Sequence, residues 1–136
     1  MDDLHRRTLE ALPEAVLVAD RAGAIQLWSA AATRIFGFSA EQTLGRSLDL
    51  IIPERQRARH WDGYRRVVAT GVTQYGDRVL AVPALRADGK RISVEFTVAL
   101  LRDARGQVDG IVALLRDVTE RWERERERAK AASSGA

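Results

Sequence analysis

The sequence of 136 residues contains no cysteine. This absence excludes disulfides, thiolate metal sites, a cysteine nucleophile and any chromophore attached through sulfur. Histidine is nearly missing as well, since only His5 and His60 occur. The sequence also has no Ser/His/carboxylate constellation, no H-E-x-x-H and no glycine-rich phosphate loop followed by Lys-[Ser/Thr]. We therefore predict no catalytic residue and no enzymatic activity.

Long apolar runs are absent too. No run approaches the roughly 20 apolar residues that span a bilayer, and the N-terminus MDDLHRRTLE has no signal-peptide hydrophobic region. Hydrophobic residues make up 46% of the chain and charged residues 30%, which is typical of a soluble globular protein. The length suits one domain with a single core. The sequence therefore predicts a cytoplasmic protein with no membrane segment.

The net charge of +3 comes from a local excess of arginine. Between Glu54 and Arg66 there are five arginines and two acidic residues. A solvated helix face accounts for this excess as well as a phosphate-binding stripe does. We therefore do not predict nucleic acid as a partner, and a DNA binder with strongly salt-dependent affinity stays an alternative.

Hydrophobic periodicity and turn residues predict the order of helices and strands. Residues 1–12 have leucines at helical spacing and precede Pro13, residues 15–20 read as a buried strand, and residues 25–28 as the second arm of a hairpin. The other expected elements are short helices at 30–36 and from Ser39 to near Leu44, a longer helix at 53–70, and strands at about 72–85, 91–101 and 108–117.

Individual residues sharpen this prediction. Ser29 is expected to cap the helix at 30–36, and Ser39 with Gln42 resembles a capping box. Pro83 cannot donate a ladder hydrogen bond, so it is expected near a strand end or in an edge strand. The strand at 91–101 alternates most clearly. Its expected buried face consists of Ile92, Val94, Phe96, Val98 and Leu100.

The longer helix carries three neighbouring aromatic rings. Projecting it at about 100° per residue places His60 and Trp61 on one arc with Tyr64 and two valines. Arg59, Asp62 and Arg66 fall on the opposite side. The three rings are therefore expected to face inward, where they either fill the core or contact a ligand.

The character of the sequence changes after Asp117. VTERWERERERAK has helical propensity but almost no apolar seam beyond Val118 and Trp122. We expect a helix at 119–130 that projects from the domain and needs a partner to stabilise it. Residues 131–136 are expected to be a disordered tail or a linker.

Four segments in this order resemble the PAS sensor family (PAS/PAC, S-box type). WSAAATRIFGFSAEQTLGRSL resembles the segment written W-N-x-A-A…G-Y…E…G-x-x, and LIIPERQRARHWDGYRRVVATG resembles the family's long helix with its Pro-Glu start and ATG end. LRADGKRISVEFTVALLRD matches the R-x-D-G-x hairpin, and GIVALLRDVTERWERE matches the last strand with its D-[IV]-T-E exit. The resemblance covers roughly residues 5 to 120. One departure is Ser29, where many relatives have Asn.

This resemblance implies an α+β fold, with a five-stranded antiparallel sheet and short helices packed on one face around a small pocket. The expected domain plan is an N-terminal amphipathic cap helix at 1–12, a PAS core at 13–118 and a signalling helix at 119–130. The family commonly forms homodimers through the N-terminal helix and the outer sheet face. It passes its signal through the C-terminal helix to an effector, which this chain does not contain.

The resemblance also tests which cofactors are possible. The light-sensing flavin class and the yellow-protein class both need a cysteine, so covalent flavin and thioester chromophores are excluded. The haem class takes its axial histidine from the long helix. Aligned on Asp62-Gly63-Tyr64, that position is Trp61, and His60 lies one residue, or about 100° of helix, away. Since the projection leaves His60 in the inward arc, haem stays possible and is the one metal-containing group considered.

The resulting hypothesis is a non-catalytic PAS sensory or interaction module. The pocket candidates are His60, Trp61, Tyr64 and Arg78. The candidates for signal relay are Asp117 and Thr119, which resemble the D-x-T junction, and Trp122 on the exiting helix. The alternatives are a haem-binding gas or redox sensor that uses His60 and a ligand-free dimerisation scaffold. The effector is expected to be a histidine kinase, a cyclic-nucleotide enzyme or a transcription regulator.

Overall fold

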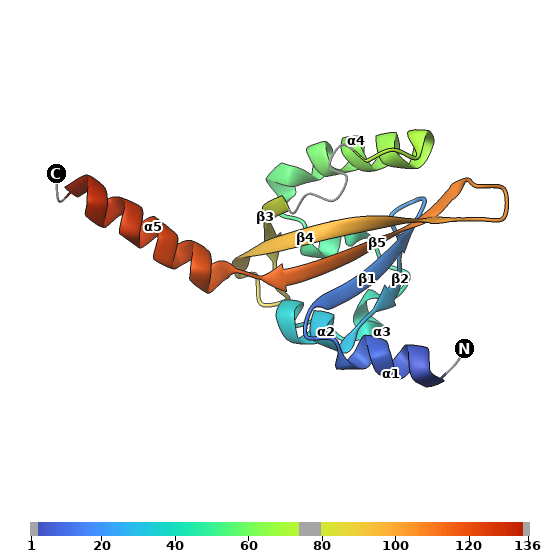
Figure 1. The fold of residues 1–136 in the computed structure, drawn as a ribbon, viewed down its shortest axis with the longest axis horizontal. Helices are drawn as coiled ribbons and strands as arrows, with labels where there is room; N and C mark the ends of the chain where they lie inside the picture. Colours follow the sequence, from blue (N-terminus) through green and yellow to red (C-terminus); the bar gives the residue numbers. More distant parts are fainter. Residues whose placement is uncertain (1–2, 74–79, 135–136) are drawn as a thin grey trace.

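The computed structural model describes residues 3–73 and 80–134 as a five-stranded antiparallel sheet with helices (Figure 1). The strands lie in the order β2-β1-β5-β4-β3, so the predicted α+β fold is confirmed. The strands are β1 Ala15–Asp20, β2 Ile25–Trp28, β3 Leu80–Leu85, β4 Arg91–Arg102 and β5 Val108–Asp117. The helices are α1 Asp3–Ala11, α2 Ala30–Phe36, α3 Ala40–Thr43, the 3-10 helix η1 Leu48–Ile51, α4 Glu54–Thr70 and α5 Thr119–Ser134.

Strand β4 has the alternation of buried and outward residues that its sequence predicts. Ile92 and Val94 are buried in the core, and Phe96, Val98 and Leu100 pack against it. The intervening residues lie on the outer face of the sheet, because successive side chains of a strand point to opposite faces. One face of β4 therefore meets the helices, and the other is the outer surface.

The two short helices after β2 begin as their cap residues predict. Ser29 accepts a hydrogen bond from the backbone of Ala32, and Ser39 forms a reciprocal capping box with Gln42. Helix α2 ends at Gly37, whose φ of 83° is a left-handed conformation that glycine adopts without strain. These caps turn the chain twice and position Phe36 in the core.

Two segments differ from the sequence-based expectation. Residues 48–51 form the 3-10 helix η1, where only a short apolar segment was expected. Residues 72 and 73 were expected in the third strand but lie in no strand, and the described part of this strand is β3, Leu80–Leu85. Pro83 lies in β3, which is an edge strand, as its missing N–H predicts.

Helix α5 leaves the end of β5 and projects away from the sheet (Figure 1). It continues to Ser134, so residues 131–134, which were expected to be a disordered tail or a linker, are helical. Ala131 and Ala132 have high helix propensity, and the helix therefore extends past Lys130. Among the described residues, no helix combines the length and hydrophobicity needed to cross a membrane.

Candidate functional site

The structure brings the three rings of α4 together. The ring centres of His60 and Trp61 are 4.6 Å apart, those of Trp61 and Tyr64 are 5.3 Å apart, and those of His60 and Tyr64 are 5.6 Å apart. Tyr64 is buried, while His60 and Trp61 are half-buried. The rings form one cluster, but their polar atoms have different surroundings.

Trp61 fastens α4 to two neighbouring segments. Its indole N–H donates to the Asp49 carboxylate in η1 at 2.7 Å. Its ring lies so close to Gly23 in the β1–β2 turn that a Cβ there would come within 2.1 Å of it. Gly23 also has a φ of 85°, so both the turn and the ring require glycine.

Tyr64 ties the same side of α4 to the end of β1. Its hydroxyl donates to the backbone carbonyl of Asp20. Burial, reinforced by the negative charge of Asp20, raises the pKa of the Tyr64 phenol. The phenol therefore stays protonated and remains a hydrogen-bond donor.

His60 differs, because its Nδ1 is buried and has no hydrogen-bond partner among the described residues. Burial lowers the pKa of His60 below its ordinary value of 6.5, and the carboxylate of Asp49 opposes this shift. The imidazole is therefore neutral at pH 7 and has a free nitrogen. One turn earlier on α4, Oε1 of Gln56 is also buried and unpartnered within the described part of the chain.

Both unpaired groups belong to cavities between α4 and the sheet. The outer cavity has a volume of about 400 Å³, and Gln56 and His60 both line it. Its opposite wall comes from β3 and β4 and includes Pro83, Phe96 and Val98. The inner cavity of about 140 Å³ shares His60 and Tyr64 with the outer one, and its other walls are mainly aliphatic. The arrangement can hold a mostly apolar ligand with a few polar groups.

The four predicted pocket residues differ in whether they line the cavities. His60 and Tyr64 line both cavities, whereas Trp61 lines neither and packs on Gly23 instead. Arg78 lies outside the described residues. Sequence reasoning missed Gln56, which stands four residues before His60 on the same helix edge and could have been found by that spacing.

The start of α5 is fixed to β4 by a short hydrogen-bond network. The Ser93 backbone N–H donates to the Thr119 hydroxyl at 2.9 Å, and the Val118 N–H donates to the Ser93 carbonyl at 2.9 Å. The Asp117 carboxylate accepts from the backbone N–H of Thr119 and from its hydroxyl. The residues predicted to form the exit junction therefore meet there, and Ser93 is the strand residue that they hold.

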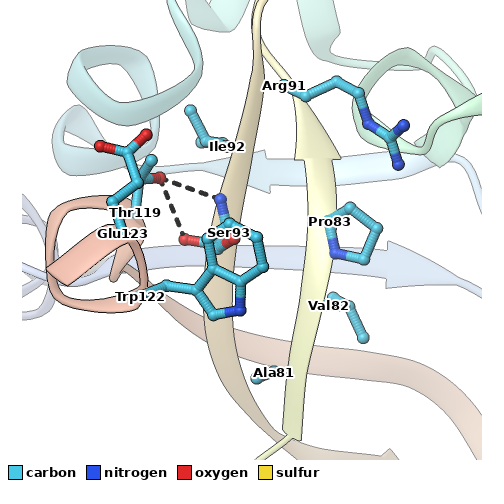
Figure 2. Close-up of a pocket in the computed structure, with 9 residues that line it drawn as sticks. All are labelled: Ala81, Val82, Pro83, Arg91, Ile92, Ser93, Thr119, Trp122 and Glu123. Atoms are coloured by element: carbon cyan, nitrogen blue, oxygen red, sulfur yellow. Dashed lines mark hydrogen bonds between the residues drawn. The ribbon is translucent and has the colours of Figure 1, made fainter. Parts of the chain in front are cut away.

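Trp122 lies one turn further along α5, over the outer face of β3 and β4. Figure 2 shows its indole beside Ser93 and Pro83, in a groove of about 420 Å³. The side chain is 42% exposed, and the guanidinium of Arg126 stacks over its ring at 4.8 Å from the centroid. Arg121 forms an ion pair with Glu95 of β4. The first turn of α5 is thus bound to the strand whose other face lines the cavity.

The family follows from comparison with known proteins. The family model described as the PAS fold matches residues 9–123. The chain therefore belongs to the PAS family, and it is a PAS sensory domain. The structure is similar to the crystal structure of the PAS domain of a protein from Colwellia psychrerythraea. The two share a TM-score of 0.74 and 21% sequence identity, over 88% of this chain and 99% of that one. At this identity the likeness shows the fold alone.

Two curated relatives are more similar in sequence. The chain is 38% identical over 118 residues to an uncharacterized protein of Azorhizobium caulinodans, covering 86% of this chain and 16% of that protein. It is 30% identical over 115 residues to the sensor protein FixL of Bradyrhizobium diazoefficiens, covering 85% of this chain and 22% of FixL. The chain thus spans less than a quarter of the length of either relative.

Proposed function

We propose that this PAS domain binds a small organic ligand between α4 and the sheet and relays its presence through α5. The observation that carries the proposal is a pair of buried atoms, Gln56 Oε1 and His60 Nδ1, that have no partner among the described residues and lie beside a mostly apolar cavity. A buried polar group without a partner costs about 1–3 kcal/mol. A ligand with complementary polar groups recovers that cost on binding, which makes these atoms natural contacts.

Strand β4 supplies the route from the cavity to α5. Its inward residues Phe96 and Val98 line the cavity, and its outward residues Ser93 and Glu95 hold Thr119 and Arg121 of α5. A ligand that shifts β4 relative to α4 therefore acts on the exit junction. We assign Asp117, Thr119 and Trp122 to this relay, with the output received by an effector domain or protein and no catalysis in this domain.

We further propose that the domain acts as a cytoplasmic homodimer through α1 and the outer sheet face. Leu4 on α1 is 56% exposed. The outer faces of β1 and β5 present Val18, Val112 and Leu114, which are only partly buried. Native mass spectrometry is expected to give twice the mass of the chain. A mass of one chain across the micromolar range would rule out this dimer.

Mass spectrometry also tests ligand binding. The purified domain, denatured and analysed by liquid chromatography, is expected to release a small organic molecule. Gln56→Leu/His60→Leu is expected to release much less of it while keeping the same far-ultraviolet circular dichroism. If the wild type releases no small molecule, the proposal fails and a scaffold without ligand remains.

Haem is a second candidate because His60 supports it directly. The imidazole lines the cavity and is neutral, which is the form that binds iron. On the other side, no described residue gives its Nδ1 the hydrogen bond that usually orients an axial histidine. Bound haem would supply an iron centre that responds to gases or redox state. Expression with haem available and His60→Ala as the variant give the test, since the haem candidate requires a Soret band that the variant loses.

A further inference from the structure

Helix α4 has a glycine in its interior at the rim of the outer cavity. Gly63 lines the cavity, and, apart from its two chain neighbours and the helix backbone, no described heavy atom lies within 4 Å of a Cβ at this position. Glycine within a helix is destabilising relative to alanine. Neither packing nor backbone conformation therefore requires it, and its missing side chain leaves the rim open.

Two arginines flank this gap on the same edge of α4. Arg59 precedes Gly63 by one turn and Arg66 follows it by almost one turn, and both line the cavity. Arg59 makes no ion pair with any described residue, while Arg66 pairs with Asp62 at 3.1 Å. None of the described residues that line this cavity is an aspartate or a glutamate.

The rim and the interior therefore differ in character. Arg59 and Arg66 are exposed and positively charged, so they attract anions to the opening. Behind them, Val67, Phe96 and Val98 form an apolar wall. The two unpaired atoms of Gln56 and His60 lie between these zones on α4 and can bond a polar group of a ligand.

We propose that the ligand of this cavity is an organic anion whose apolar body enters past Gly63 and whose anionic group pairs with Arg59 and Arg66. This inference rests on the proposed function and adds the chemical class of the ligand. A guanidinium can bind a carboxylate, sulfonate or phosphate group through two parallel hydrogen bonds. The long side chains of the two arginines allow both to reach one anionic group at the opening.

A matched pair of fluorescent probes tests the charge. Anilinonaphthalene sulfonate carries an apolar ring system and a sulfonate, and phenylnaphthylamine carries the same rings without the charge. We expect the wild-type domain to bind the sulfonate about tenfold more tightly, because charge-assisted hydrogen bonds to arginine add to the apolar contact. Raising the salt concentration is expected to reduce this difference, since the rim is exposed.

Three single variants and a control locate the binding. Arg59→Gln and Arg66→Gln are each expected to weaken sulfonate binding about fivefold and to leave the neutral probe unchanged. Arg65→Gln removes the same charge from α4 at a position that does not line the cavity, so its binding should match the wild type. Gly63→Leu should weaken both probes by closing the rim, and its melting temperature should be at least that of the wild type.

The outcomes separate this inference from the proposed function. Equal wild-type affinities for the two probes, or no effect of Arg59→Gln and Arg66→Gln, would contradict the inference that the ligand is an anion. The proposal that the cavity binds a ligand would not be affected. If the wild type binds neither probe, or if Gly63→Leu leaves both unchanged, the inference of an organic anion entering past Gly63 fails. The proposed function is then decided separately, by whether the purified domain releases a small molecule on denaturation.

Discussion

The cavity beside α4 and the exit junction at α5 lie on opposite faces of β4 and differ in whether their polar groups are hydrogen-bonded. In the cavity, Gln56 and His60 each have a buried atom that no described residue hydrogen-bonds. At the junction, Ser93 and Thr119 hydrogen-bond to each other, and Asp117 accepts from Thr119. The cavity therefore has polar atoms available to bind a ligand. At the junction the polar groups are hydrogen-bonded to one another, so the junction changes only if these bonds break.

The same contrast is found between neighbouring residues around α4. Trp61 and Tyr64 donate hydrogen bonds to Asp49 and Asp20, although Tyr64 also lines the cavity. Gln56 and His60, next to them, face the cavity. The hydrogen bonds of Trp61 and Tyr64 therefore hold α4 in position, while the side chains of Gln56 and His60 are available to contact a ligand.

The largest expected effect comes from disturbing the packing of Trp61. Gly23→Ala forces a left-handed residue to carry a Cβ that collides with the Trp61 ring. We expect the free energy of unfolding to fall by about 3 kcal/mol, measured by urea denaturation. Gly89→Ala is the matched control, because its φ of 86° is the same and nothing lies within 4 Å. It should cost about 1 kcal/mol. An equal fall in the free energy of unfolding in both variants would show that the collision with Trp61 contributes nothing to the loss.

Removing one hydroxyl should loosen the junction. Thr119→Val keeps the shape of the side chain but leaves the Ser93 N–H without its partner, at a cost of about 1–2 kcal/mol. Amide hydrogen exchange should accelerate at Ser93 and in the first turn of α5. Thr97→Val, on the same outer face of β4, removes a hydroxyl that makes no hydrogen bond with the described residues. Similar exchange in both variants would contradict the assigned network.

A smaller change tests the hydrogen bond of Trp61 separately from its ring. Trp61→Phe keeps an aromatic ring near Gly23 but removes the N–H that donates to Asp49. The expected loss is about 1 kcal/mol in the free energy of unfolding, since the pair is only partly buried. In Asp49→Ala/Trp61→Phe, where Asp49→Ala has already removed the acceptor, the change at Trp61 should cost much less than it does alone. Full additivity of the two losses would mean that the bond contributes nothing.

The smallest effect is a pH dependence from His60 on α4. Burial lowers the pKa of folded His60, so the unfolded chain binds this proton more readily than the folded one. The free energy of unfolding should therefore fall as pH drops below 6.5, and the fall should end below the folded pKa. His60→Phe should flatten this part of the profile, whereas His5→Gln on exposed α1 should not. An unchanged slope in His60→Phe would contradict the shift.

The elements that sequence reasoning predicted are those with local causes. The alternation of β4 needs only a period of two residues, and the cap at Ser39 needs only Gln42 three positions later. The shared arc of His60 and Tyr64 follows from helical periodicity alone. Each of these depends on neighbours within one turn or one strand, so no distant contact can change it.

The features that sequence reasoning missed depend on distant partners. In the sequence, Asp20 ends an expected strand and Asp49 stands in a short apolar segment, and only the fold brings them to Tyr64 and Trp61. Arg59 and Arg66 project to the polar side of α4 as predicted, but the cavity opens at the border of that side. Position on a helix face predicts exposure, and it does not predict what lies beside the face.

The sequence by itself determined the order of strands and helices, the caps, and the family, because these follow from short-range periodicity and from motifs in a set order. Tertiary structure alone decided which polar atoms of α4 are satisfied. The reason is geometric: hydrogen bonds from Trp61 and Tyr64 span 12 and 44 residues of chain, and the packing of α4 on the sheet leaves Gln56 and His60 facing a space instead of a partner.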